Sequence, residues 1–425
     1  MNITTKLLTT FLLNATFFII MFIASVVISR VLGPENFGIY RFVLLVATTI
    51  ALFCSFGLHE ILILKLSQKA IQLKDYLTNV LGALIPLYSV VLCIIFFYIS
   101  KNETFTDKPL LIACLSFCII HLLDYHFQPA IYATDRIIKN SILMILKQST
   151  FLILIFVLYF NNAVNLTNIF WVLSFANTFA IIYVLYLNHV NKTNIKARLV
   201  ISADLISKAI RLYISNILNF MTLNVNIYIL RFYVGFYEIG LYALAVTLVE
   251  KIWLIPDSVR SVMYLELSNE RRGEEFVAQI LRFFTFFIII IGTLLFVTSN
   301  RLIIFVFSSE YKDSVLPLLI LLPGVLIFGL SRIINAFFIV RELVSINMYA
   351  SAIIAFTNIT LIMLFVPRYG IIGASFASSI AFTIGSVYHI AKFSKESGIN
   401  ILNLLIIKKD DFQLLKLYKT KGTMS

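Results

Sequence analysis

Residues 77–100, LTNVLGALIPLYSVVLCIIFFYIS, contain no charged side chain and are long enough to cross a lipid bilayer. The hydrocarbon core of a membrane requires about 20 apolar residues per helix. Residues 7–29 and 343–367 are equally free of charge. Over the whole chain, 60% of the residues are hydrophobic and only 13% are charged, whereas a soluble domain carries about 25% charged residues. The sequence therefore predicts an integral membrane protein.

Twelve apolar stretches of this kind follow one another along the 425 residues, joined by short segments. We expect helices, because backbone polar groups in lipid must be hydrogen-bonded within the protein, and barrel strands would be shorter and alternate in polarity. The longest connection is expected at 257–281, which leaves no room for a separate soluble domain. The expected spans are 11–29, 41–63, 77–99, 109–132, 141–160, 167–187, 209–231, 238–258, 281–299, 315–340, 346–366 and 370–391.

The basic residues behind the net charge of +13 are distributed unequally between the two sides of the membrane. If the N-terminus is cytoplasmic, the inner segments hold 23 of the 34 Lys and Arg residues and the outer segments hold 8. Cytoplasmic loops carry such an excess, so both termini are expected in the cytoplasm. This distribution accounts for the charge without a nucleic acid partner. The basic tail 392–425 is expected to lie on the anionic inner surface of the membrane.

The two halves of the chain resemble each other at a shift of 202 residues. The string GPENFGIY at 33–40 aligns with GFYEIGLY at 235–242, each after the first helix of its half. A unit of six spans begins and ends on the same side, so two copies share one orientation and have a cleft between them. We expect two six-helix lobes, 1–200 and 201–391. Tight turns in which glycine permits positive φ are expected at Gly33, Gly38, Gly235 and Gly240.

The seventh expected span carries polar side chains on one face. Their spacing of three or four residues places them on one side of a helix. Such a stripe suits a water-filled path, and two cations at one mouth exceed what packing requires. Hydrogen bonds that hold helices together are the alternative. The stripe consists of Lys208, Arg211, Ser215, Asn219, Thr222 and Asn226.

Charged side chains inside the expected spans are further candidates, since each costs about 2.5–3.5 kcal/mol at mid-bilayer on insertion scales. Asp124 and Glu250 are candidate sites for ion coupling, and Asp124 shares a helix face with His121. The cations outnumber these acids, which favours a cleft for an anionic cargo. Each charge could instead form an ion pair that fixes packing, or extend to the interface. The cations in question are Lys147, Arg211, Lys251 and Arg332.

Motifs for catalysis and cofactors are missing from the sequence. It contains no G-x-x-x-x-G-K-[ST] phosphate loop, and no Ser-His-Asp signature or His–Glu pair at metal-binding spacing lies in a loop. The four cysteines lie in apolar spans, and no His or carboxylate completes a metal set with them. We therefore expect a protein that is not an enzyme and that holds no cofactor or metal. Its transport would be driven by a gradient, a potential or consumption of the product.

Two stretches carry a family resemblance. ISRVLGPENFGIY at 28–40 resembles the segment after the first helix of polysaccharide flippases, and VPRYGIIGAS at 366–375 resembles their turn between the last two helices. A looser likeness lies at 309–317. The chain thus resembles the O-antigen (Wzx-type) flippases of the multidrug/oligosaccharidyl-lipid/polysaccharide exporter superfamily. The resemblance implies two pseudo-symmetric six-helix bundles around a central cleft, and it places Arg30 among the cations of that cleft.

The function that this resemblance implies is movement of an undecaprenyl-diphosphate-linked oligosaccharide, the O-antigen repeat unit, from the inner to the outer leaflet of the bacterial cytoplasmic membrane by alternating access. Membrane lipid and possible polysaccharide polymerase machinery would be its partners. Flippases for capsule, teichuronic-type or peptidoglycan precursors share the fold and remain alternatives. A cation-coupled drug antiporter would favour an acidic, aromatic cleft. A membrane polymerase would carry a long outer loop, whereas the longest expected loop is on the inner side.

Overall fold

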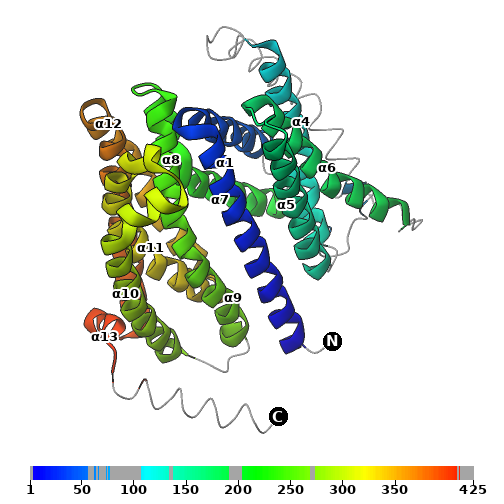
Figure 1. Ribbon diagram of the computed structural model, residues 1–425. Helices are drawn as coiled ribbons and strands as arrows, with labels where there is room; N and C mark the ends of the chain where they lie inside the picture. Colours follow the sequence, from blue (N-terminus) through cyan, green and yellow to red (C-terminus); the bar gives the residue numbers. More distant parts are fainter. Residues whose placement is uncertain are drawn as a thin grey trace. The chain divides into compact units, whose positions relative to one another are not determined.

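The computed structural model describes residues 3–55, 107–133, 137–190, 203–268, 273–408 and 411, with a few positions between 62 and 76. The described residues form helices and no strand, as Figure 1 shows. The expected third span lies outside them. The helices are α1 (Ile3–Cys54), α4 (Lys108–Ala133), α5 (Ile137–Phe160), α6 (Leu166–Val190), α7 (Ala203–Arg231), α8 (Phe236–Glu250), the 3₁₀ turn η2 (Lys251–Trp253), α9 (Leu254–Ser268), α10 (Glu274–Val306), the 3₁₀ turn η3 (Ser309–Ser314), α11 (Val315–Val340), α12 (Val344–Ser397) and α13 (Ile401–Leu405).

Eight helical stretches among the described residues are long and apolar enough to cross a membrane. Two of them, Ala15–Cys54 and Val344–Ser397, have 40 and 54 residues, about twice what one crossing requires. A glycine with non-helical backbone angles divides each of the two. The predicted all-α integral membrane fold is confirmed.

The dividing glycines show why the first and last helix pairs need no loop. Gly33 has φ 68° and ψ 172°, and Gly370 has φ 51° and ψ −130°; glycine adopts such angles without the steric cost of a side chain. Pro34 then begins the second arm of α1, where its missing N–H would lack a helical partner anyway. The prediction of positive φ is wrong for Gly235, which is extended at φ −76°. It is also wrong for Gly38 and Gly240, which are buried inside helices.

The chain folds into two compact units, Met1–Ile217 and Leu218–Ser425. The division falls inside α7, whereas the sequence suggested a boundary at residue 200. In unit 1, α4 packs against α6, and α1 packs against α5 and α4. Their apolar faces meet in a core that contains Ile50, Leu122, Phe127, Leu143 and Val184.

In unit 2, α11 is the central helix and packs against α8, α9, α10 and α12. Small residues allow α11 and α12 to approach closely, as is common between membrane helices. A Cβ added to Gly324 would lie 2.5 Å from the backbone of Ser379. The expected long connection 257–281 is largely helical, because α9 extends to Ser268 and α10 begins at Glu274. The polar ends of these helices made them resemble a loop in the sequence.

Candidate functional site

The helical segment that follows Gly235 switches from α-helical to 3₁₀ geometry after Glu250. There α8 ends, η2 forms one 3₁₀ turn, and α9 begins at Leu254. Pro256 explains the change, because proline has no N–H to donate and its ring clashes with the carbonyl four residues earlier, that of Ile252. A 3₁₀ stretch within a long helix often marks a functional hinge. Glu250 and Lys251, both predicted site residues, lie half-buried at this junction.

Arg332 of α11 is held in place by Asp257 of α9. The Arg332 Nε donates to Asp257 Oδ1 at 3.0 Å, and its Nη2 donates to Asp257 Oδ2 at 2.6 Å. This two-pronged geometry is the strongest that an arginine and a carboxylate form. The Arg332 guanidinium carbon also lies 4.9 Å from the centre of the Trp253 ring, within range of a cation–π attraction. The predicted cation is therefore fixed in one orientation.

An aromatic group supports the Trp253 ring. The Trp253 Nε1 donates to the Val325 carbonyl at 3.0 Å, so its polar atom is satisfied. Phe328 and Phe382 stack at 4.9 Å and both meet Trp253 edge-on. All three rings are buried. Their packing leaves little freedom for the indole on which Arg332 rests.

A second guanidinium shares the same carboxylate. Arg260, one turn after Asp257 on α9, places its Nη2 3.4 Å from Asp257 Oδ1. We call Asp257, Arg260 and Arg332 the Asp257 cluster; its formal charge is +1, because two cations meet one anion. Its side chains are 31%, 33% and 19% exposed, respectively. The cluster thus presents a partly accessible positive charge suited to an anionic ligand.

The polar stripe of α7 passes through different environments. Asn226 is buried and donates to the Tyr242 hydroxyl at 2.5 Å and to Ser378 Oγ at 2.6 Å. Its own Oδ1 accepts from Asn358 at 2.7 Å. We call Asn226, Tyr242, Asn358 and Ser378 the Asn226 network. It joins α7, α8 and both arms of α12 by neutral hydrogen bonds.

The other stripe residues differ in exposure. Thr222 is buried and donates to the backbone carbonyl of Leu218 at 2.8 Å and of Ser351 at 3.4 Å. Asn219 is exposed and Ser215 is half-buried. The side chains of Lys208 and Arg211 lie outside the described residues, so the two cations at the mouth of the stripe remain a prediction.

Unit 1 brings Lys147 and Asp124 together. The Lys147 Nζ of α5 donates to Asp124 Oδ2 of α4 at 2.5 Å, and the Asp124 side chain is only 5% exposed. The other Asp124 oxygen is buried without a hydrogen-bond partner among the described residues. His121, one turn away, lies 3.2 Å from the Thr48 hydroxyl of α1. Arg30, the remaining predicted cation, is exposed on α1 just before Gly33.

Several residues of these sites were not among the predicted ones. Asp257 and Arg260 were assigned to a connecting segment, although their three-residue spacing would place them on one helix face. No sequence pattern linked Asn226 to its partners Tyr242, Asn358 and Ser378, because a single sequence does not say which spans are neighbours. Among the described residues, no group of three His, Cys, Asp or Glu side chains could hold a metal ion.

Comparison with known sequences places these features in a family. The family described as "Polysaccharide biosynthesis protein" matches residues 3–255. A curated relative, the "Capsular polysaccharide biosynthesis protein CapF" of Staphylococcus aureus, is 23% identical over 375 residues, which cover 85% of this chain and 91% of the relative.

Solved structures share the fold at low identity. The lipid II flippase MurJ in an inward closed conformation matches with a TM-score of 0.65 and 18% identity, covering 95% of each chain. An inward-facing multidrug transporter of the MATE family and MOP superfamily matches with a TM-score of 0.68 and 11% identity, covering 90% of this chain and 96% of that one. A MOP superfamily transporter from Pyrococcus furiosus gives a TM-score of 0.62 at 11% identity, covering 94% and 95% of the two chains. The chain therefore has the fold of these transporters.

Proposed function

The chain belongs to the polysaccharide biosynthesis protein family, and on that premise we propose that it is a flippase for the lipid-linked repeat unit of a surface polysaccharide. It acts as a transporter rather than an enzyme, in the bacterial cytoplasmic membrane with both termini in the cytoplasm. The undecaprenyl-diphosphate-linked oligosaccharide moves from the inner to the outer leaflet by alternating access, while its polyprenyl tail stays in lipid. The product then passes to polysaccharide polymerase machinery.

The capsular relative favours a capsular repeat unit as the cargo. The O-antigen repeat unit expected from the sequence is the other candidate, because both carry the same diphosphate and differ in their sugars. Teichuronic-type and peptidoglycan precursors share that diphosphate as well. The chemistry common to all of them is an anionic head group followed by a polar glycan.

The Asp257 cluster is the observation that carries this proposal. Arg332 and Arg260 share one carboxylate, so the cluster keeps a positive charge in a partly accessible place. Arginine is suited to phosphate because its planar fork of donors matches two phosphate oxygens. The diphosphate binds Arg260 and the accessible edge of Arg332, and Asp257 keeps both guanidiniums oriented. A cationic drug would be repelled by the same cluster.

The membrane potential supplies a driving force for the anion. An inside-negative potential favours outward movement of negative charge by about 2.3 kcal/mol per charge per 100 mV. A diphosphate with about two charges therefore gains about 4.6 kcal/mol at 100 mV. Ion coupling at Asp124 or Glu250 would add to this force.

Deletion of the gene in its host tests the function. We expect loss of surface polymer and accumulation of lipid-linked repeat units in the inner leaflet, both restored by the intact gene. Analysis of the sugars in the accumulated lipid distinguishes capsular from O-antigen cargo. Normal polymer together with altered drug sensitivity would instead identify a drug antiporter.

Substitution of Arg332 tests the site. We expect Arg332→Gln to lower export by about 10-fold or more in the complemented strain, because the guanidinium that meets the diphosphate is lost. Arg332→Lys keeps the charge but not the two-pronged geometry, so it should retain part of the activity. Arg341→Gln is the matched control, since Arg341 forms an exposed ion pair with Glu274 and should be dispensable. Export by Arg332→Gln equal to that of the control would refute the site.

A further inference from the structure

Arg282 of α10 is a fully buried cation whose partners come largely from the end of the chain. Its side chain is 1% exposed. The Nε donates to Asp411 Oδ2 at 2.7 Å, and Nη2 donates to Asp411 Oδ1 at 2.6 Å. The Nη1 donates to the Asn403 carbonyl at 2.9 Å. More than 100 residues of sequence separate Arg282 from both Asp411 and Asn403, so these are long-range tertiary contacts.

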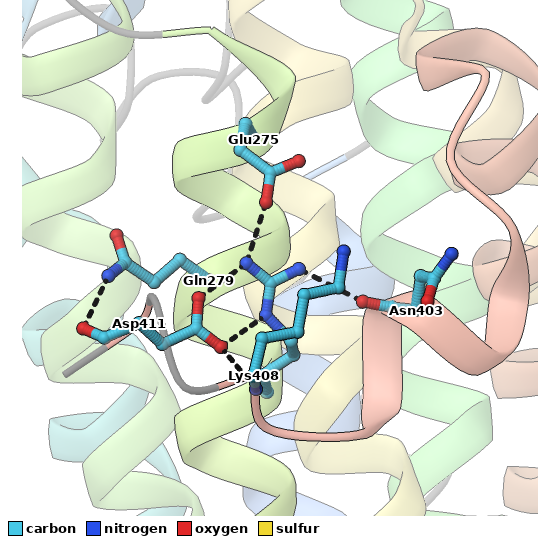
Figure 2. A network of polar contacts seen from close by, with 6 residues as sticks. Glu275, Gln279, Asn403, Lys408 and Asp411 are labelled. Atoms are coloured by element: carbon cyan, nitrogen blue, oxygen red, sulfur yellow. Dashed lines mark hydrogen bonds and ion pairs between the residues drawn. The ribbon is translucent and has the colours of Figure 1, made fainter. Parts of the chain in front are cut away.

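Asp411 is itself fixed by further bonds. Its carboxylate accepts from the Lys408 backbone N–H at 2.8 Å, and its carbonyl accepts from Gln279 Nε2 at 3.1 Å. Figure 2 shows Gln279 of α10 bonded to Asp411, with Asn403 and Lys408 of the C-terminal segment close by, whereas Glu275 of α10 bonds only the Arg282 guanidinium. Asp411 is only 2% exposed. The carboxylate and the guanidinium are therefore both removed from solvent.

Apolar packing joins the same segment to the body of unit 2. Gly398 ends α12 at φ 69°, and the Asn400 side chain caps the short helix α13. Leu404 of α13 is fully buried in a core with Val277 and Leu281 of α10. In Figure 1, α13 lies beside one end of α10. We call Gly398–Lys408 together with Asp411 the C-terminal clasp.

The energetics of a buried charge make the clasp necessary. Removing one partner of a buried ion pair leaves an uncompensated charge, which is strongly destabilising, whereas replacing both partners by apolar residues is often neutral. Glu275 also accepts from Arg282, at 2.7 Å, but its side chain is 62% exposed. Water screens that pair, so Glu275 cannot substitute for Asp411.

We propose that the C-terminal clasp is a structural closure that joins the start of α10 to the end of α12 and neutralises Arg282. The segment is thus an integral part of unit 2 rather than only a tail. Export depends on it through the stability of unit 2, without any partner bound to the clasp. This inference does not rest on the nature of the cargo.

Point substitutions in the full-length protein test the clasp. We expect Asp411→Ala to lower the melting temperature of the purified protein by roughly 10 °C and to reduce its amount in the membrane and its export. Glu275→Gln is the matched control at the same guanidinium and should shift the melting temperature by about 2 °C or less. Equal melting of Asp411→Ala and wild type would overturn the proposal.

The double variant Arg282→Met with Asp411→Leu separates electrostatic closure from recruitment of a partner. Because no buried charge remains, we expect its melting temperature and its export to recover to near the wild-type values, above those of Asp411→Ala. Failure of the double variant to melt above the single variant would refute the electrostatic role. Restored melting with export still abolished would also refute the proposal, because it would assign the clasp a binding function.

Discussion

The Lys147 ammonium group lies 2.5 Å from the Asp124 carboxylate, so two charges expected to act separately form one ion pair inside unit 1. The pair connects α5 to α4, next to the contact between His121 and Thr48 of α1. If the pair is structural, apolar residues at both positions should preserve stability and export. If it takes part in transport, the same replacement should abolish export.

For the pair, we expect Lys147→Met to lower the free energy of unfolding by about 3 kcal/mol, since Asp124 would keep its charge in a buried place. The double variant Lys147→Met with Asp124→Leu should regain most of that loss. Thermal unfolding of the purified variants measures both effects, and export measured in parallel tests ion coupling. A stable double variant with wild-type export would remove Asp124 from the ion-coupling candidates.

The turn at Gly370 should be sensitive to a single methyl group. Its backbone, at φ 51° and ψ −130°, is a conformation that residues with a side chain rarely adopt. We expect Gly370→Ala to destabilise the protein by about 1–3 kcal/mol. The neighbouring Tyr369 is exposed, so Tyr369→Ala should unfold at nearly the wild-type temperature. If both variants melted alike, strain at this turn would not limit stability.

The pKa of the Asp411 carboxyl predicts how the stability contributed by the C-terminal clasp depends on pH. Burial raises the pKa of its carboxyl, but the hydrogen bonds and charge of Arg282, with the N–H of Lys408, lower the pKa more, and the net shift is downward. A lowered folded pKa stabilises the protein above the ordinary aspartate value of about 3.9, and this stabilisation is lost as the pH falls through the folded value.

The matching measurement compares the melting temperatures of wild type and Asp411→Asn across pH. We expect a constant difference between pH 5 and 8, which shrinks below about pH 4 as the wild-type carboxylate becomes protonated. A difference that instead changed between pH 6 and 8 would show that another group controls the effect.

Local chemistry in the sequence was sufficient to predict the membrane fold. Charge-free stretches such as 343–367 are unambiguous, because backbone groups in lipid leave few structural choices. Gly33 followed by Pro34 also predicted its turn. The aligned string in the second half, 235–242, led to a wrong prediction of positive φ at Gly235. There Phe236 follows the glycine in place of a proline, and Gly235 is the extended residue that precedes α8. One shared residue type does not fix a backbone angle.

Partners across helices could not be predicted in the same way. The four-residue step from Thr222 to Asn226 correctly implied a shared helix face, but not that Tyr242 and Ser378 would complete a buried network with Asn226. Asp257 was treated as part of a loop, although it orients Arg332. Such pairings depend on which helices are neighbours, and helix order along the chain does not determine it.

The turn at Gly370 has a consequence for how the chain enters the membrane. Its two arms follow each other without a polar loop, and Arg368 is the only Asp, Glu, Lys or Arg between Glu342 and Lys392. We expect a helix pair joined in this way to insert as one hairpin, because no long hydrophilic segment separates the two arms. Arg368 is then the one Asp, Glu, Lys or Arg between Glu342 and Lys392 that the insertion machinery has to accommodate. The turn is also so short that it offers few residues for a protease or an antibody to bind.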